Sequence, residues 1–284
     1  MLAVIGTIPD NNFPLKAGLV TRQGEDLFIE GEKIKINRGT PALIAAALEI
    51  DRLVSQRGVF CYLIGDIGRG EGSQKLYVYL QNHLPKTIFS TLVFHYILPD
   101  VDGHNRVLLA IQEMPKKPIL IADAGYMYAA KMSGQAPEYD LFTPDVGELA
   151  FLADELAPHP FYTRGFILHE DNRVPDLIAR AYAHENAARY LLVKGNIDYV
   201  VNQQGIIAKI EEPCVEALEA IGGTGDTLTG MVGALVASGK EIVEAAILGA
   251  RLNRLAGYLA NPDPGTSVRE IIKCIPEAWE EILK

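Results

Sequence analysis

The stretch Ile221-Gly-Gly-Thr-Gly-Asp-Thr-Leu-Thr-Gly230 places glycines and one acid directly before an amphipathic segment. Apolar residues recur at helical spacing from Leu228 to Val236, and Gly239 ends the pattern. Glycines let backbone N–H groups point into one concavity, and the positive end of a helix dipole adds attraction for an anion. We therefore expect a phosphate site at a helix N-terminus, formed by Gly222, Gly223, Thr224 and Gly225.

Asp226 requires an explanation at this place, because its negative charge repels the same anion. One explanation is that its carboxylate takes a proton from a substrate hydroxyl while a phosphoryl group arrives and a metal helps to hold the charge. The other is that Asp226 is a helix N-cap and the glycines form a tight turn. The stretch is not a Walker loop, because Met231 and Val232 stand where Lys and Ser/Thr belong.

Short apolar runs alternate with helical patterns along the chain, which predicts an α/β fold with a mainly parallel sheet flanked by helices. We expect strands at 59–64, 119–121 and 190–193, and helices at 41–53 and 174–189. The carboxyl ends of parallel strands carry the binding crevice of such a sheet. Three polar residues that follow the expected strands should therefore lie near a site: Asp66, Asp123 and Lys194.

The chain is expected to form one domain over residues 1–284, with an added hairpin within residues 1–36 around Gly31. Ser267 and Glu270 have the spacing of a capping box. Three turn-rich segments are expected to be surface loops: 99–105, 157–164 and 169–173.

Composition excludes several classes of protein. The 26 basic and 36 acidic residues give a net charge of −10, which disfavours nucleic acid as a partner. No apolar run is long enough for a membrane helix, and we expect no signal peptide. Cys61, Cys214 and Cys274 lack the spacing of zinc sites and are odd in number, so we expect reduced thiols and a cytoplasmic protein.

The segment Ala220–Gly230, continued by Ala234-Leu235, Gly239 and Glu244-Ala-Ala246, resembles the signature of the ADP/ATP-dependent NAD(P)H-hydrate dehydratases of the ribokinase-like superfamily. The resemblance covers roughly residues 38 to 280. Other segments agree in order: Arg38-Gly-Thr-Pro-Ala-Leu43, Pro118-Ile-Leu-Ile-Ala-Asp123, Thr143-Pro-Asp-Val-Gly-Glu148 and Leu191-Leu-Val-Lys-Gly195.

The resemblance implies nucleotide-dependent repair of hydrated NAD(P)H. The hydroxyl of the hydrate is first converted to a phosphate ester, which then eliminates to restore the C=C bond of the nicotinamide ring. Asp226 would be the base of the phosphoryl-transfer step, with ADP or ATP as the phosphoryl donor and Mg²⁺ as a cofactor. Family members are often oligomeric, so the resemblance also implies a homo-oligomer.

The same resemblance assigns further residues. Glu148 would organise Mg²⁺ indirectly, although a solvated acid at a helix start is an alternative. Lys194 and Gly195 would meet nucleotide phosphate, unless Lys194 is an ordinary exposed lysine. Asp123 would contact substrate or stabilise a turn. The full set of implied substrate contacts is Gly39, Thr40, Asp66, Asp123 and Asp145.

The glycine-rich loop Gly65–Ser73 is a second candidate for holding a phosphate or a dinucleotide, and a surface turn is its alternative. It departs from the Gly-Pro-Gly-Leu-Gly type of loop that the family has in this region. The histidines have no metal-binding spacing, and the sequence assigns chemistry to none of them: His83, His95, His104, His159, His169 and His184.

Three departures from the family concern contacts with the substrate or the nucleotide rather than the phosphate site. Asp145-Val-Gly-Glu148 replaces His-Pro-Gly-Glu, the Asn253-Arg254 region replaces a helix histidine, and Val215–Leu218 replaces an Asn-Pro/Gly-Met segment. Two other functions therefore remain open. One is a kinase that phosphorylates a sugar- or vitamin-like alcohol, and the other is a nucleotide-binding regulatory protein without turnover.

Overall fold

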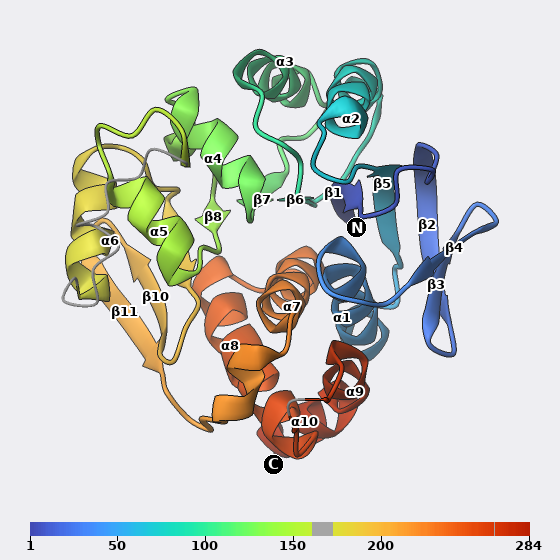
Figure 1. Cartoon of the computed structure of the whole chain (residues 1–284), viewed down its shortest axis with the longest axis vertical. Coiled ribbons are helices and arrows are strands. Elements are labelled where there is room, and N and C mark those ends of the chain that lie inside the picture. Colours follow the sequence, from blue (N-terminus) through green and yellow to red (C-terminus); the bar gives the residue numbers. More distant parts are fainter. Residues whose placement is uncertain (161–172, 264) are drawn as a thin grey trace.

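The computed structural model describes residues 1–160, 173–263 and 265–284. At its centre lies an 11-stranded sheet with the strand order β11-β10-β9-β8-β7-β6-β1-β5-β2-β3-β4 (Figure 1). The strands are β1 (Leu2–Ile8), β2 (Lys16–Gln23), β3 (Asp26–Ile29), β4 (Glu32–Lys35), β5 (Val59–Gly65), β6 (Thr91–His95), β7 (Ile119–Ala122), β8 (Leu141–Phe142), β9 (Tyr190–Val193), β10 (Asp198–Asn202) and β11 (Gly205–Ile210).

The middle of this sheet is parallel. Every neighbouring pair from β9 through β8, β7, β6 and β1 to β5 runs in the same direction. Antiparallel strands extend both edges, with β10 and β11 at one edge and β2, β3 and β4 at the other. The expected α/β fold with a mainly parallel sheet is confirmed.

Helices cover both faces of the sheet (Figure 1). Those on one face are α1 (Thr40–Val54), α7 (Thr224–Ser238), α8 (Ile242–Leu259), α9 (Val268–Lys273) and α10 (Ile275–Ile282). Those on the other face are α2 (Glu71–His83), α3 (Val101–Gln112), α4 (Gly125–Met132), α5 (Val146–Ala153) and α6 (Val174–Ala183).

Strand β1 contributes side chains to the hydrophobic cores on both faces of the sheet. Leu2 and Val4 pack into the core beneath α1 and α7, whereas Ala3 and Ile5 pack into the core beneath α2 and α3. Successive side chains of a strand point to opposite faces, so a strand that is covered on both sides is apolar throughout. All seven residues of β1 are buried.

Helices α1 and α7 pack so closely that a side chain at Gly230 would collide with the backbone carbonyl of Leu43. The last glycine of the motif therefore serves helix packing. This contact fixes the N-terminus of α7 relative to the N-terminus of α1, and both termini lie at the carboxyl edge of the parallel strands.

The expected N-terminal hairpin is present, because β3 pairs with β4 around Gly31, which has φ of +83°. The start of the chain, however, is not an addition to the fold. Strand β1 lies between β5 and β6 at the centre of the sheet.

Two expected elements differ from the structure. The helix expected at 174–189 ends at Ala183, because the backbone folds back through Glu185, where φ is +56°, and Asn186 N donates to Ala181 O. The loop expected at 99–105 is wrong beyond its first residues, because the Asp100 side chain accepts from Gly103 N and starts α3. Of the other two expected loops, residues 161–164 and 169–172 lie outside the described residues.

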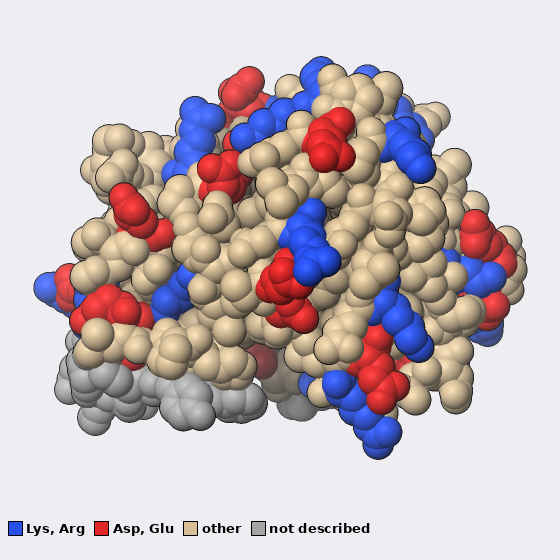
Figure 2. Space-filling model, turned by 90° about the horizontal axis from the view of Figure 1, so that it is seen from above, with Lys and Arg blue, Asp and Glu red and all other residues tan. Residues whose placement is uncertain are grey.

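The capping box of Ser267 and Glu270 is confirmed at the start of α9. Among the described residues, no helix is both long and apolar enough to cross a membrane. On the face shown in Figure 2, Lys and Arg side chains are interspersed with Asp and Glu side chains and do not form one basic surface.

Candidate active site

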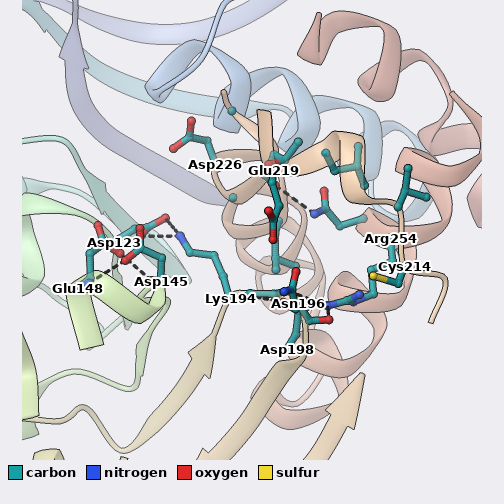
Figure 3. Close-up of a pocket in the computed structure, with 18 of the residues that line it drawn as sticks. Asp123, Asp145, Glu148, Lys194, Asn196, Asp198, Cys214, Glu219, Asp226 and Arg254 are labelled. Carbon is teal, nitrogen blue, oxygen red and sulfur yellow. Dashed lines mark hydrogen bonds and ion pairs between the residues drawn. The ribbon is translucent and has the colours of Figure 1, made fainter. Parts of the chain in front are cut away.

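A cavity of about 370 Å³ lies where the N-terminus of α7 meets the carboxyl ends of the parallel strands (Figure 3). Asp123 follows β7, Asp145 and Glu148 start α5 after β8, and Lys194 follows β9. Residues from these three segments and from the N-terminus of α7, which are far apart in the sequence, therefore line one cavity, as the rule for open α/β sheets requires.

The glycine loop forms one wall of this cavity. Gly223 is the residue before α7 and has φ of +110°, a conformation that glycine adopts readily. A side chain at Gly223 would also press against Val268 and the backbone of Arg38. The first turn of a helix leaves N–H groups without partners inside the helix. No side chain among the described residues caps the N-terminus of α7, so these N–H groups can meet an anion.

Asp226 is not the N-cap of α7, because Gly223 holds that position and the carboxylate of Asp226 points to other elements. Its Oδ2 accepts a hydrogen bond of 2.6 Å from Gly39 N, and its Oδ1 lies 3.0 Å from His95 Nε2. The side chain is 12% exposed and lines the cavity. The interpretation of Asp226 as a helix cap is therefore wrong.

Burial alone would raise the pKa of Asp226, but its neighbours outweigh this effect. The hydrogen bond from His95, the charges of His95 and Lys194, and the amide of Gly39 together hold the pKa below its ordinary value. Asp226 is thus an anion at neutral pH, which is the form that a general base requires.

Lys194 and Asp123 form a largely buried ion pair. Lys194 Nζ lies 2.9 Å from both carboxylate oxygens of Asp123, and the two side chains are 12% and 2% exposed. Thr229 Oγ1 donates to the same carboxylate over 2.5 Å. Lys194 also lies against Gly225, where an added side chain would contact its ammonium group. The positive charge of Lys194 therefore lies beside the glycine loop, and Lys194 is not an ordinary exposed lysine.

Asp145 and Glu148 form a capping box at the start of α5. Asp145 Oδ1 accepts from Glu148 N over 2.7 Å, and Glu148 Oε2 accepts from Asp145 N over 2.8 Å. Burial raises the pKa of the partly exposed Glu148 well above its ordinary range; Lys194 opposes this rise, and Asp123 and Asp145 add to it. Glu148 therefore starts a helix, and it also lines the cavity beside Asp123 and Asp145.

The opposite end of the cavity is fixed by α8 (Figure 3). Asn253 bonds to Thr227 Oγ1 and to Thr224 O in the first turn of α7. Arg254 is buried, with Nε 2.7 Å from Asp198 Oδ2 and with further hydrogen bonds to the carbonyl oxygens of Gly195, Asn196 and Glu211. The loop that begins at Gly195 is therefore held in place by Arg254. Cys214, Val215 and Leu218 complete this end of the cavity.

The remaining sequence-predicted residues separate into two groups. Gly39 and Thr40 contact the site indirectly, since Gly39 N donates to Asp226 and Thr40 Oγ1 contacts His95 Nδ1. Asp66 is not brought into the cavity. Its carboxylate accepts hydrogen bonds from the loop that follows it, including the N–H groups of Gly68, Arg69 and Gly70.

This pattern corrects the hypothesis about the Gly65–Ser73 loop. The amides that would cradle a phosphate there donate to Asp66, and so do Ser73 N and Oγ. The glycines give the loop its shape, because Gly68 and Gly70 have φ of +90° and +86°. The loop therefore binds its own carboxylate.

His95 contacts the site, although the sequence assigned no chemistry to it. It is the last residue of β6 and is fully buried, and its ring lies between Thr40 on α1 and Asp226 on α7. The sequence does hold a signal for His95, because a polar residue at the carboxyl end of a buried strand is expected near the site, as Asp123 is after β7. The histidines were considered only as metal ligands, and His95 was therefore given no role.

Within the described part of the chain, ligand atoms of His95, Asp123 and Asp226 lie within 4.8 Å of one another, close enough to share a cation. Each group, however, already has a closer partner. His95 and Asp226 are hydrogen bonded to each other, and Asp123 is paired with Lys194. We therefore interpret the three residues as a hydrogen-bonded pair, His95 and Asp226, beside the ion pair of Asp123 with Lys194.

The fold is ribokinase-like, and the cavity contains an acid at a helix N-terminus that no side chain caps among the described residues. Residues 103–277 match the family described as NAD(P)H-hydrate dehydratase, and the chain belongs to this family. Its structure is similar to that of the ADP/ATP-dependent NAD(P)H-hydrate dehydratase from Bacillus subtilis, with a TM-score of 0.59 and 13% identity over 99% of this chain and 89% of that one.

The relatives that are similar in sequence include an uncharacterized protein and a dehydratase. An uncharacterized protein of Methanocaldococcus jannaschii is 44% identical over 243 residues, which cover 85% of this chain and all of that protein. The ADP-dependent (S)-NAD(P)H-hydrate dehydratase of Natrialba magadii is 30% identical over 100 residues, which cover 34% of this chain and 37% of that protein.

Proposed function

We propose that the protein dehydrates hydrated NAD(P)H with ADP or ATP as the phosphoryl donor, and that Asp226 is its general base. The observation that carries this proposal is the pairing of an ionised, oriented carboxylate with a helix N-terminus that no side chain caps among the described residues. Family membership supplies the class of substrate, and the cavity supplies the groups for the chemistry.

The loop residues Gly222–Gly225 would receive the transferring phosphoryl group. Their backbone N–H groups and the dipole of α7 attract its charge, and Lys194 adds a positive charge next to Gly225. Phosphoryl transfer depends mainly on such positioning and electrostatic stabilisation. We place the rest of the nucleotide toward Gly195 and Asn253, because the cavity extends in that direction from the loop.

Asp226 would act on the acceptor. It takes the proton of the substrate hydroxyl while that oxygen bonds to phosphorus and the bond to the nucleotide breaks. In the second stage the bond between the ring carbon and this oxygen breaks, and its electron pair leaves with the phosphate. Loss of a proton from the neighbouring carbon then restores the C=C bond.

The acidic group of Asp123, Asp145 and Glu148 fits a divalent cation. The pKa of Glu148 is raised mainly by burial, and the charges of Asp123 and Asp145 add to the rise. Carboxylates are ligands that Mg²⁺ accepts, often through water. When bound, Mg²⁺ would neutralise charge on the nucleotide phosphates. Of the three residues, Glu148 is the one we assign to this task, because Asp123 is paired with Lys194 and because the resemblance to the family gives Glu148 this role.

We also propose that the enzyme acts in the cytoplasm as a homo-oligomer on its small-molecule substrate. The three cysteines are free in the structure, which fits a reducing compartment. Size-exclusion chromatography with light scattering would test the oligomeric state.

The experiment that tests the function supplies hydrated NADH with ADP or ATP and Mg²⁺, and follows the absorbance of restored NADH. The proposal expects NADH and inorganic phosphate in equal amounts. A stable phosphorylated product from a different alcohol would indicate a kinase instead. If the protein bound the nucleotide without any turnover, and if Asp226→Asn left the affinity for the nucleotide unchanged, the protein would be regulatory.

A further inference from the structure

A hydrogen-bonded line of three side chains leads from α1 to the reacting end of the cavity. Thr40 Oγ1 lies 3.0 Å from His95 Nδ1, and His95 Nε2 lies 3.0 Å from Asp226 Oδ1. The histidine and the threonine are buried, and only Asp226 reaches the cavity. The steps of the reaction described above use Asp226 alone and leave the other two residues without a task.

The fold makes room for this line at a specific place. A side chain at Gly6 on β1 would lie 2.6 Å from His95 O and less than 3 Å from the side chain of Thr40. Gly6 therefore lets both residues approach the central strand. The residue after His95 is also fixed, since Tyr96 has φ of +50° and its carbonyl accepts from Thr7 Oγ1 over 2.6 Å.

The direction of one hydrogen bond follows from chemistry. The carboxylate of Asp226 can only accept, so the proton of this bond lies on His95 Nε2. At Nδ1 both directions are open, because the hydroxyl of Thr40 either donates to a neutral ring or accepts from a charged ring. Thr40 thus keeps the ring in one orientation in both protonation states.

The charges around the ring favour the same arrangement. Asp226 on α7 and Asp123 after β7 face Nε2, the latter at 3.9 Å, and Lys194 after β9 is paired with Asp123. The ring of Tyr96 lies nearly perpendicular to that of His95, with an interplanar angle of 85°, and Thr40 on α1 faces the other ring nitrogen. Because Asp123 is paired with Lys194, the hydrogen bond of His95 Nε2 is made with Asp226.

We propose that His95 is the positioning residue of this site: its N–H fixes one oxygen of Asp226 while Gly39 N–H fixes the other, and the pair keeps the carboxylate anionic and turned toward the substrate hydroxyl. The kinetic part of this inference rests on the proposed function. The role of Thr40 is to hold the ring of His95.

The test compares His95→Leu, which removes the donor, with His95→Gln, whose amide can still donate. We expect His95→Leu to lower kcat by ~10-fold or more with little change in the KM of the nucleotide, because the base is no longer aimed. The acidic limb of its pH–rate profile should move to higher pH. His95→Gln should recover part of kcat. The matched control is His83→Leu, at an exposed histidine on α2, and it should leave kcat and the pH–rate profile unchanged.

A second measurement does not depend on turnover. In protein labelled at the carboxyl carbon of aspartate, the NMR signal of Asp226 is assigned by its loss in Asp226→Asn, and its titration midpoint is measured. The midpoint should rise in His95→Leu and rise less in His95→Gln. An unchanged midpoint and an unchanged pH profile in folded His95→Leu would overturn the inference. If the wild type has no dehydratase activity but this midpoint shifts, the proposed function fails and the positioning role stands.

Discussion

Replacing Lys194 with methionine should destabilise the protein strongly, because it leaves the carboxylate of Asp123 buried without its cation. Asp123 is 2% exposed, and both of its oxygens lie 2.9 Å from Lys194 Nζ. Removing one partner of a buried pair costs about 3–5 kcal/mol. Asp123 keeps hydrogen bonds from Thr229 and from Ala124 N, so we expect the free energy of unfolding to fall by about 3 kcal/mol, the lower end of that range.

Urea unfolding at pH 7, followed by circular dichroism, measures this loss. The double substitution Lys194→Met with Asp123→Asn should recover most of it, because no uncompensated charge remains. Lys117→Met, at a lysine whose side chain is 67% exposed, should change the free energy of unfolding by less than about 0.5 kcal/mol. If Lys194→Met weakened nucleotide binding but left the stability unchanged, the ion pair would not have the structural role inferred here.

Three further predictions concern single residues. Asp226→Asn should reduce turnover by ~10²-fold or more and leave nucleotide binding by calorimetry largely intact, because it removes the base but not the glycine loop. The raised pKa of Glu148 means that the folded state binds its proton more tightly than the unfolded state does. The free energy of unfolding should therefore fall as pH rises from the ordinary glutamate pKa to the raised value, and Glu148→Gln should remove this part of the pH dependence. Gly230→Ala should lower the free energy of unfolding by about 1–3 kcal/mol, because the added methyl group collides with the Leu43 carbonyl; an unchanged urea midpoint would contradict the close packing of α1 and α7.

Local patterns predicted most of the fold. The strands at β5, β7 and β9 were readable because each is a short apolar run before a polar residue, and α7 because its apolar face has helical period. The end of α6 was not readable. A backbone reversal at Glu185, set by Asn186 N and Ala181 O, stops that helix, and side-chain periodicity does not record such a reversal.

The sequence predicted those parts of the site whose residues are close together in the chain. The glycine loop and Asp226 form one motif, so their shared position could be inferred. His95 could not be found in this way, because its bond to Asp226 joins residues 131 positions apart and exists only because helix α7 packs against strand β6. The prediction that Asp66 lies at the site relied on its local pattern alone. An acid before glycines can accept hydrogen bonds from its own loop as readily as it can bind a ligand.

The central claim is that Asp226 and the glycine loop convert the substrate hydroxyl into a phosphate ester before it leaves. Hydrated NADH prepared in ¹⁸O-water carries the label in that hydroxyl, and mass spectrometry of the released phosphate reports where the oxygen goes. The account predicts one ¹⁸O atom in each phosphate released by the wild type, and release of labelled phosphate that is slower by ~10²-fold or more with Asp226→Asn. Label found in water, with unlabelled phosphate and restored NADH, would contradict it.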